Sequence, residues 1–202
     1  MEVTVTRIRG IEAVTGKLSH LPHIVERATV SGLNKISAQA FTAASRAMRE
    51  EYAIKQADLA KSKALVRVSA KRETTASGPR LFAMIIARMQ SIPLYKFSPS
   101  KAKSQKGIPV KKRRPVTVKV KRKEGRKPVQ GGFIATMKSG HTGIFKRGGK
   151  ESLPIHELFT ASAGAMFKKF GIEAARKIAV AKGAAIIRHE LDFFLRKEGL
   201  KK

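Results

Sequence analysis

The histidines and acidic residues are the side chains in this chain that could catalyse a reaction or bind a metal ion. His20 and His23 stand three residues apart, but no cysteine and no acidic residue completes a metal site at a usable spacing. The His-Glu pairs at 156–157 and 189–190 are weak acid/base candidates, because adjacent side chains on a helix point away from each other. We therefore expect capping or surface positions for His20 and His23, and no metal site.

Two further motifs fall short of a catalytic site. His141 lies in a predicted hairpin turn, where an exposed side chain is expected. The Gly-Gly-Lys at 148–150 shares residue types with phosphate-binding loops, but the longer Gly-x-x-x-x-Gly-Lys-Ser/Thr frame is absent. We therefore predict that the protein is not an enzyme and has no catalytic residues and no cofactor. An enzyme would need a buried, pKa-shifted carboxylate or histidine beside a pocket.

The net charge is the outlier of the composition. The 202 residues include 43 Lys and Arg against 14 Asp and Glu, a formal charge of +29. Such an excess repels itself unless anions lie nearby. Nucleic acid or an acidic protein neighbour suits this chain better than a membrane, because no amphipathic helix carries the Trp/Phe-rich face of a membrane-surface helix. No apolar run approaches the roughly 18 residues that span a bilayer.

Many of the cations crowd into the middle of the chain, with Glu124 as the single acid among them. We predict that they contact either DNA phosphates or an acidic partner protein, and a solvated loop is the alternative. Tyr95 and Phe97 precede the run, and no DNA-reading motif is present, so base-specific binding is not expected. The predicted contact residues are Lys101, Lys103, Lys106, Lys111, Lys112, Arg113, Arg114, Lys119, Lys121, Arg122, Lys123, Arg126 and Lys127.

Hydrophobic spacing predicts a long helix in the first quarter of the chain, from about Pro22 to Arg49. Its apolar face follows three- and four-residue spacings through Val30, Leu33, Ser37, Phe41, Ala44 and Met48. The many Ala and Ser residues would let another backbone approach closely. Residues 2–8 alternate and predict an edge strand or an extended arm, and a second, short helix is expected over 56–63.

The middle of the chain has the pattern of strands separated by loops. Strands are expected at 65–68 and 81–89, with a turn at 77–79 between them. The segment 81–86 is apolar on both faces and predicts a central strand covered on each side, with a short buried helix as the alternative. Loops are expected at 98–107 and 124–128. Between them Val116, Val118 and Val120 alternate with polar residues, which indicates a half-buried strand.

A hairpin and helices are predicted for the last third. Strands at 133–137 and 142–147 flank a tight turn at Ser139-Gly140, because glycine tolerates the positive φ of such turns. The Leu-Pro-Ile at 153–155 is expected to lead the backbone out of the sheet. Helical turns follow at 160–170, and then a helix at 171–196. The apolar stripe predicted for that helix is Val180, Ala184, Ile187, Leu191 and Phe194.

Helices at both ends and a strand-rich middle indicate an α+β fold, with an antiparallel sheet packed on the long N-terminal helix and with C-terminal helices. We expect residues 1–202 to form a single domain with a basic loop at about 98–114 and a helical C-terminal extension from about 160. The absence of cysteine excludes disulfides, and the first residues lack the apolar region of a signal peptide. Both features indicate synthesis in the cytoplasm.

The region 131–159 resembles the phage minor tail protein Z family, the tail-completion proteins of long-tailed phages. It has the same order of a Gly-x-Phe-Ile strand, a glycine-containing turn, a strand that ends in basic residues, a Pro-Ile segment and a C-terminal helix. The resemblance implies a structural protein without turnover. Its copies would form a homo-oligomeric ring of six at the head-proximal end of the tail and enable head–tail joining.

The resemblance also implies the partners and the location of the protein. The partners would be the tail terminator, the tail tube and the head–tail connector, with genomic DNA as a further candidate and no membrane. The protein would be assembled in the host cytoplasm and remain in the tail or neck of the virion. A sequence-independent nucleic-acid-binding protein is the alternative function. A monomeric, salt-sensitive binder of DNA or RNA would favour that alternative.

Rings need contacts between two unlike surfaces of the subunit. We predict that the hairpin and the segment 153–167 contact neighbouring subunits or the tail terminator. Phe193 makes the apolar arc of its helix wider than one core contact requires. We therefore expect Phe193 either to lie in a subunit interface or to pack against residues 160–170. The predicted interface residues are Phe133, Ile134, Ile144, Phe145, Ile155, Leu158, Phe159 and Phe193.

Overall fold

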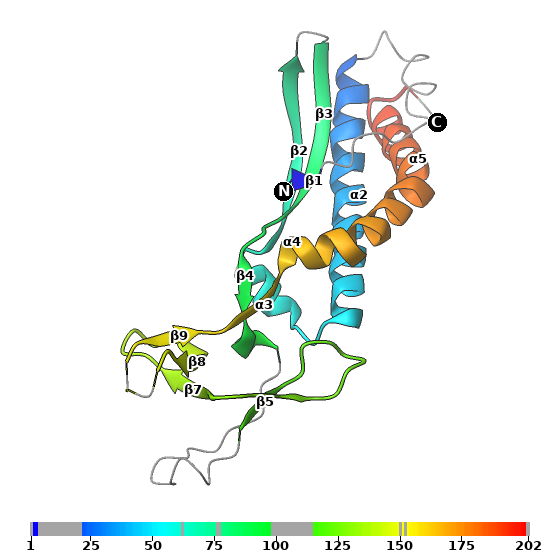
Figure 1. Cartoon of the computed structure of the whole chain (residues 1–202). Helices are drawn as coiled ribbons and strands as arrows, with labels where there is room; N and C mark the ends of the chain where they lie inside the picture. The colour runs from blue at the N-terminus through cyan, green and yellow to red at the C-terminus, as the bar shows by residue number, and fades with distance from the viewer. Residues whose placement is uncertain are drawn as a thin grey trace.

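The computed structural model describes residues 2–3, 22–61, 63–75, 78–97, 115–149, 151 and 153–200. Two long helices lie against each other, α2 (Pro22–Glu51) and α5 (Ile172–Lys197) (Figure 1). An antiparallel sheet packs on α2, and several short strands lie at the end of the molecule where α2 ends. The predicted α+β class, with a sheet on a long N-terminal helix and helices at the C-terminus, is confirmed.

Small residues let α2 and α5 pack closely, as the Ala and Ser content predicts. A Cβ atom at Gly32 of α2 would lie 2.3 Å from Cδ1 of Ile187 on α5, so only glycine fits there without a shift of that side chain. Ile36 packs with Ala179 and Ile187 in the same seam. Within α2, the predicted core positions Ser37, Ala44 and Met48 are buried, whereas Val30, Leu33 and Phe41 are half-buried.

The predicted apolar stripe of α5 is wrong in its first half. Ile187 and Leu191 are buried and Phe194 packs beside them, but Val180 is 69% exposed and Ala184 is also exposed. The buried positions of that half are Ala175, Ala179 and Gly183. Because α2 approaches this part of α5 closely, the smallest residues occupy the seam and the larger Val180 faces outward.

The larger sheet has the strand order β1-β3-β2 and is antiparallel throughout. Its strands are β1 (Glu2–Val3), β2 (Leu65–Thr75) and β3 (Gly78–Ala87). β3 is the central strand, as predicted for 81–86. Leu65, Ile85 and Ala87 are buried in the main core with Ala44 and Met48 of α2. Full cover on both faces is not found among the described residues, because Phe82 and its neighbours are only half-buried.

Two predicted boundaries near this sheet need correction. The turn predicted at 77–79 is wrong at its last two residues, because Gly78 and Pro79 already pair with Thr75 and Thr74 in the ribbon of β2 and β3, and residue 77 lies outside the described residues. The short helix α3 (Gln56–Lys61) ends before the predicted residue, and Lys63 has a φ of 49° outside the helical region. The ladder between β2 and β3 supplies hydrogen bonds that a local turn pattern does not reveal.

The small strands form three further antiparallel sheets. β4 (Ser91–Pro93), followed by the 3₁₀ turn η1 (Leu94–Lys96), pairs with β10 (Phe159–Ser162). β5 (Val116–Val118) pairs with β6 (Lys127–Val129). β7 (Gly132–Thr136), β8 (Thr142–Arg147) and β9 (Ile155–Glu157) form a three-stranded sheet. The predicted hairpin is confirmed to within one residue, and Gly140 at its turn has a φ of +80°.

Three short segments predicted as loop or helix are strands instead. Ile155–Glu157 continues the hairpin sheet as β9, so Pro154 does not lead the chain out of it. Residues 160–162 pair with β4 rather than starting the helical turns, and residues 127–128 of the predicted loop belong to β6. Each segment is too short to show a period, and only β10 pairs with a strand that is distant in the sequence.

The helical segments predicted at 160–170 and 171–196 are present, but the first begins at residue 163 and continues directly into the second. Ser162 caps α4 (Ala163–Met166), because its hydroxyl accepts a hydrogen bond from the amide of Ala165 at 3.1 Å. The helix then passes through one wider turn of π-helix, η3 (Phe167–Gly171), directly into α5. Phe167 is thereby buried in the main core.

Candidate interaction surfaces

Seven of the thirteen predicted contact cations, those between 101 and 114, lie outside the described residues. The other six lie between the end of β5 and the start of β6: Lys119, Lys121, Arg122, Lys123, Arg126 and Lys127. Their segment docks at the C-terminal end of α2, where Lys121 pairs with Tyr52 and the amide of Arg122 donates to the carbonyl of Glu51 at 2.7 Å. The helix dipole favours cations at this end.

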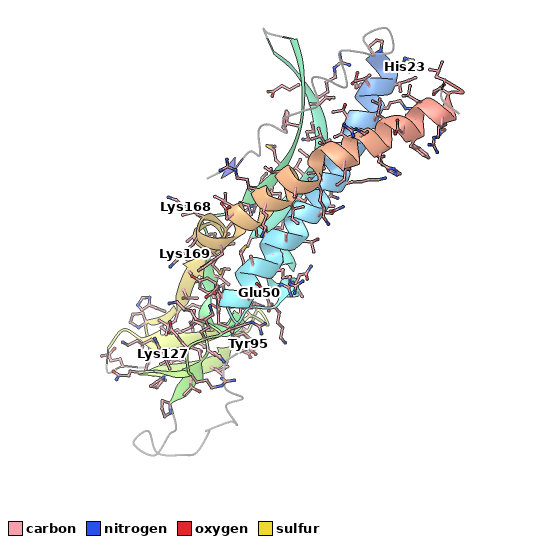
Figure 2. The ribbon with its side chains drawn as sticks, turned by 90° about the vertical axis from the view of Figure 1, so that its right-hand side faces the viewer. His23, Glu50, Tyr95, Lys127, Lys168 and Lys169 are labelled. Carbon is pink, nitrogen blue, oxygen red and sulfur yellow. The ribbon has the colours of Figure 1, made fainter. Side chains whose placement is uncertain are left out.

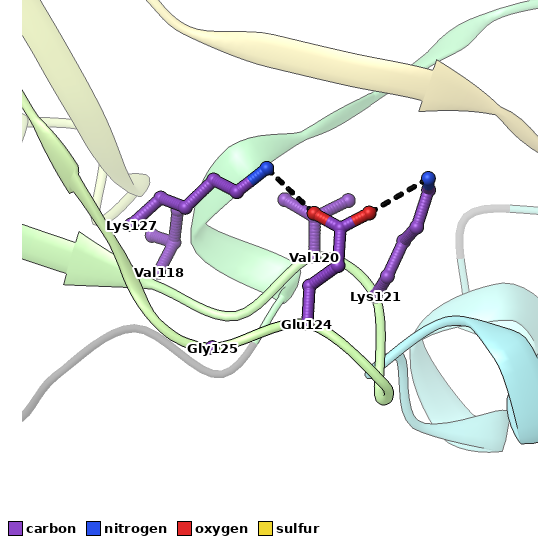
Figure 3. Close-up of a pocket in the computed structure, with 6 residues that line it drawn as sticks. All are labelled: Val118, Val120, Lys121, Glu124, Gly125 and Lys127. Atoms are coloured by element: carbon purple, nitrogen blue, oxygen red, sulfur yellow. Dashed lines mark ion pairs between the residues drawn. The ribbon is translucent and has the colours of Figure 1, made fainter.

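The single acid of this segment is paired with two of its lysines (Figure 3). Oε1 of Glu124 lies 2.8 Å from Nζ of Lys121, and Oε2 lies 2.6 Å from Nζ of Lys127. Hydrogen bonds from Lys121 and Lys127 lower the pKa of Glu124 to about 2, and the bond to Glu124 raises the pKa of Lys121. Lys123 pairs with Glu51 at 2.8 Å, and this contact raises the pKa of Lys123.

These groups border an open cavity of about 270 Å³. Its lining residues are Val118, Val120, Lys121, Glu124, Gly125 and Lys127. A carboxylate with a pKa of about 2 is a weak base and is not protonated near neutral pH, so it cannot act as a general acid or as an effective general base there. The lysines at this cavity are therefore suited to form ion pairs with an anion.

The histidines lie apart from this cavity. His23 is exposed near the start of α2, at the opposite end from Glu50 (Figure 2), and His20 lies outside the described residues. His156 and Glu157 are adjacent in β9, where successive side chains point to opposite faces, so they form no acid/base pair. The expected exposure of His141 is confirmed.

Two acidic residues have partners that sequence reasoning missed. Oε1 of Glu157 lies 2.8 Å from Nε2 of His141, across the hairpin sheet. Glu190 on α5 is buried and accepts hydrogen bonds from Lys35 and from Ser31, the latter at 2.6 Å. Burial alone would raise the pKa of Glu190, but the bonds from Lys35 and Ser31 outweigh burial and lower it. The sequence signal for this contact was the position of Glu190 next to Leu191, which belongs to the apolar stripe predicted for α5.

The hairpin sheet divides the predicted interface residues between its two faces. Ile144 is fully buried, and Ile134 and Leu158 pack around the same cluster with Val116 and Val118. The alternate residues point to the other face of the sheet, because successive side chains in a strand alternate. That outer face contains Phe133, Phe145 and Ile155.

Aromatic and charged contacts cover part of this outer face. The rings of Phe133 and Phe145 lie 6.3 Å apart, and the guanidinium of Arg147 lies 5.3 Å from the centre of the Phe133 ring. His141 meets the edge of Phe145, which is buried by its neighbours, whereas Phe133 and Ile155 are half-buried. Phe133 and Ile155 therefore remain accessible to a neighbouring molecule.

Two predicted interface residues have large exposed apolar side chains. Phe159 in β10 is 52% exposed, and Phe193 in α5 is 53% exposed and meets the edge of the Phe194 ring. Phe159 belongs to the part of the molecule with the small sheets, whereas Phe193 belongs to the last turns of α5 (Figure 1). The two side chains thus lie on different elements in different parts of the molecule.

The described part of the chain holds no cluster of three or more acidic or histidine side chains that could bind a metal ion. Nor does any helix in that part have the length and apolarity to cross a bilayer. The basic segment and the partly exposed aromatic face of the hairpin sheet offer surfaces for contact with other macromolecules.

The sequence model of the family described as prophage minor tail protein Z matches residues 8–198. The chain therefore belongs to the minor tail protein Z family, and the resemblance noted in the hairpin region is confirmed. It is a structural component of a phage tail and thus of the virion. No curated protein and no solved structure matches the chain.

Proposed function

We propose that this minor tail protein completes the head-proximal end of the tail as a ring and thereby enables head–tail joining. The observation that carries the proposal is the separation of Phe159 and Phe193, two exposed aromatic side chains on different elements. A ring is closed by one surface of each subunit that contacts a different surface of the next. The proposed contact joins β10 and the outer hairpin face of one copy to the end of α5 of its neighbour.

The proposed ring has six copies, and its partners are the tail terminator or tail tube on one side and the head–tail connector on the other. Joining requires no bond-making chemistry, because it depends on the fit of surfaces and on charge. The membership of the family supports the role in the tail. Exposed aromatic anchors support contacts between subunits, since buried aromatic side chains dominate many interfaces.

A phage that lacks this chain tests the proposal when the protein is supplied from a plasmid. The Phe159→Ser variant should leave tails and filled heads unjoined and reduce the titre of infectious particles at least about a hundredfold, because every contact between neighbouring copies loses its Phe159 anchor. Electron microscopy of lysates counts joined and separate particles.

The matched control is Val180→Ser, which removes an exposed apolar side chain from the middle of α5. This control should give a normal titre and normal joined particles. Joined particles at the wild-type level with Phe159→Ser and with the Phe159→Ser/Phe193→Ser double variant would refute the proposal.

A further inference from the structure

The two lysines that hold Glu124 are arranged as a binding site for an anion with two charged oxygen atoms. Each oxygen of the Glu124 carboxylate takes one ammonium group, from Lys121 on one side and from Lys127 on the other (Figure 3). A backbone phosphate of DNA likewise presents two oxygens on one atom that share a single negative charge. The Glu124 carboxylate thus stands where such a phosphate would bind.

The backbone on both sides of this site is fixed by hydrogen bonds. The amide of Ala53, just after α2, donates to the carbonyl of Val120 at 2.8 Å, and the amide of Lys119 donates to the carbonyl of Phe97 at 3.3 Å. Lys127 lies in β6 and pairs with the buried Val118 of β5. Because both lysines start from fixed backbone, little ordering is needed when an anion binds.

Glu124 can be displaced by a stronger anion. Its side chain is 37% exposed, and the side chains of Lys121 and Lys127 are more exposed still. Solvent screens exposed ion pairs, so a competing anion can reach both ammonium groups when the carboxylate moves into water. A DNA phosphate would form ion pairs with both ammonium groups. Its binding would also release counterions condensed on the DNA, whereas the pairing of a single carboxylate releases no condensed counterions.

The surroundings of the site favour duplex DNA over an acidic protein. Six cations lie between residues 119 and 127, and Glu124 is the one acid among them. No large apolar side chain is exposed among residues 115–130, whereas protein interfaces rely on such anchors. No aromatic residue lines the cavity, so unpaired bases would find no ring to stack on.

We propose that Lys121 and Lys127 form a clamp for a backbone phosphate of double-stranded DNA, and that Glu124 occupies this clamp until DNA displaces it. The clamp binds without regard to base sequence, because it contacts the phosphate alone. This inference goes beyond the proposed ring and does not depend on it. A chain that fails to form rings can still bind DNA through the clamp.

Binding of the full-length protein to a fluorescently labelled duplex of mixed sequence tests the clamp over a series of salt concentrations. Glu124→Gln should bind about three to ten times more tightly than the wild type, with a similar salt slope, because both proteins contact the same phosphate. Lys121→Gln/Lys127→Gln should bind at least about ten times more weakly, with a slope shallower by about one, since one phosphate contact is lost. Lys121→Arg/Lys127→Arg should retain binding.

The matched control is Glu198→Gln, which removes an acid of similar exposure, 39%, at the far end of α5, where Glu198 pairs with Arg27. It changes the net charge by the same amount but leaves the clamp intact, so it should match the wild type within about twofold. Circular dichroism and thermal unfolding of each variant confirm that it is folded.

Three results would overturn the clamp. Equal gains from Glu124→Gln and Glu198→Gln would show that only net charge matters. Unchanged binding by Lys121→Gln/Lys127→Gln with normal folding would place the DNA elsewhere. A gain by Glu124→Gln for polyglutamate but not for the duplex would assign the site to an acidic protein.

Discussion

Glu190 is an acid within an apolar seam, and its surroundings explain how the seam accommodates it. Its side chain is only 4% exposed, between Ile187 and Leu191 on the buried face of α5. Lys35 and Ser31, one turn apart on α2, donate hydrogen bonds to its two oxygens. A buried charge is tolerated when it is paired and hydrogen-bonded in this way. Glu190 therefore links one turn of α5 to two successive turns of α2.

Removal of this carboxylate should cost stability. Glu190→Ala should lower the free energy of unfolding by about 1–3 kcal/mol, because it leaves a cavity and removes the partner of Lys35 and Ser31, and Lys35 can turn to water. Urea denaturation measures the change. Glu50→Ala, which breaks an exposed pair with Arg46 on α2, should change stability by less than about 0.5 kcal/mol. Equal losses in the two variants would contradict this role of Glu190.

Acid should remove the contribution of Glu190 to stability. Its pKa in the folded protein lies below the ordinary value of 4.5, so the unfolded chain binds a proton more readily. The stabilisation is therefore complete above about pH 4.5 and is lost as the pH falls through the folded pKa. The difference in unfolding free energy between wild type and Glu190→Gln should shrink over that range. A difference that grows on acidification would contradict the assignment.

Glu124 should remain charged at any pH near neutrality. Its pKa of about 2 implies that acidification from about pH 8 to about pH 5 does not protonate it. The gain in DNA affinity of Glu124→Gln over wild type should therefore stay constant across this range. Fluorescence anisotropy at fixed ionic strength measures it. A gain that disappears near pH 5 would indicate that Glu124 titrates there and is not held by both lysines.

At the scale of elements, Ser162 ends the strand β10 and caps the helix α4. It is the last residue of β10, and its hydroxyl accepts a hydrogen bond from the amide of Ala165 in the first turn of α4. Ser162→Ala should lower the free energy of unfolding by about 0.5–2 kcal/mol, as loss of a cap does elsewhere. Thermal or urea unfolding measures the loss. Ser162→Thr keeps a hydroxyl and should recover part of it, and no recovery would argue against the cap.

The sequence predicted those elements whose signals are local. The hairpin was predicted to within one residue, because alternation and the glycine at 140 lie within a short window. α2 was predicted closely for the same reason, since its period of about 3.6 continues over 30 residues. The strands β9 and β10 were missed, because three or four residues show no period. The partner of β10 is β4, which is distant in the sequence, and the partner of β9 is β8, which was predicted as part of a hairpin without a third strand.

The candidate sites were predicted in composition but not in geometry. The sequence identified the basic stretch and its single acid, yet the pairing of Glu124 with Lys121 and Lys127 depends on how the chain turns between β5 and β6. The contact of Glu190 with Lys35 spans 155 positions, which no local pattern reports. The phase of α5 was missed at Val180 because alanines on both sides of that helix make both faces apolar.

At the scale of the whole molecule, the net charge of +29 opposes the assembly of copies of this chain. Neighbouring copies repel each other through these charges, so close contact needs apolar anchors or anions between the copies. Phe159 and Phe193 supply the anchors in the proposed ring, and DNA bound at the clamp would supply anions. Ring formation should therefore become easier as added salt screens the repulsion.

The central claim, that unlike surfaces of the subunit meet, is tested most directly by mass photometry of two variants, Phe159→Ser and Phe193→Ser, under conditions in which the wild type forms rings. Each variant lacks one of the two surfaces, so each alone should remain monomeric. An equal mixture should form one-to-one dimers and nothing larger, because each such dimer has one intact contact and two defective ends. Dimers formed by either variant alone, or a mixture that stays monomeric, would contradict the account.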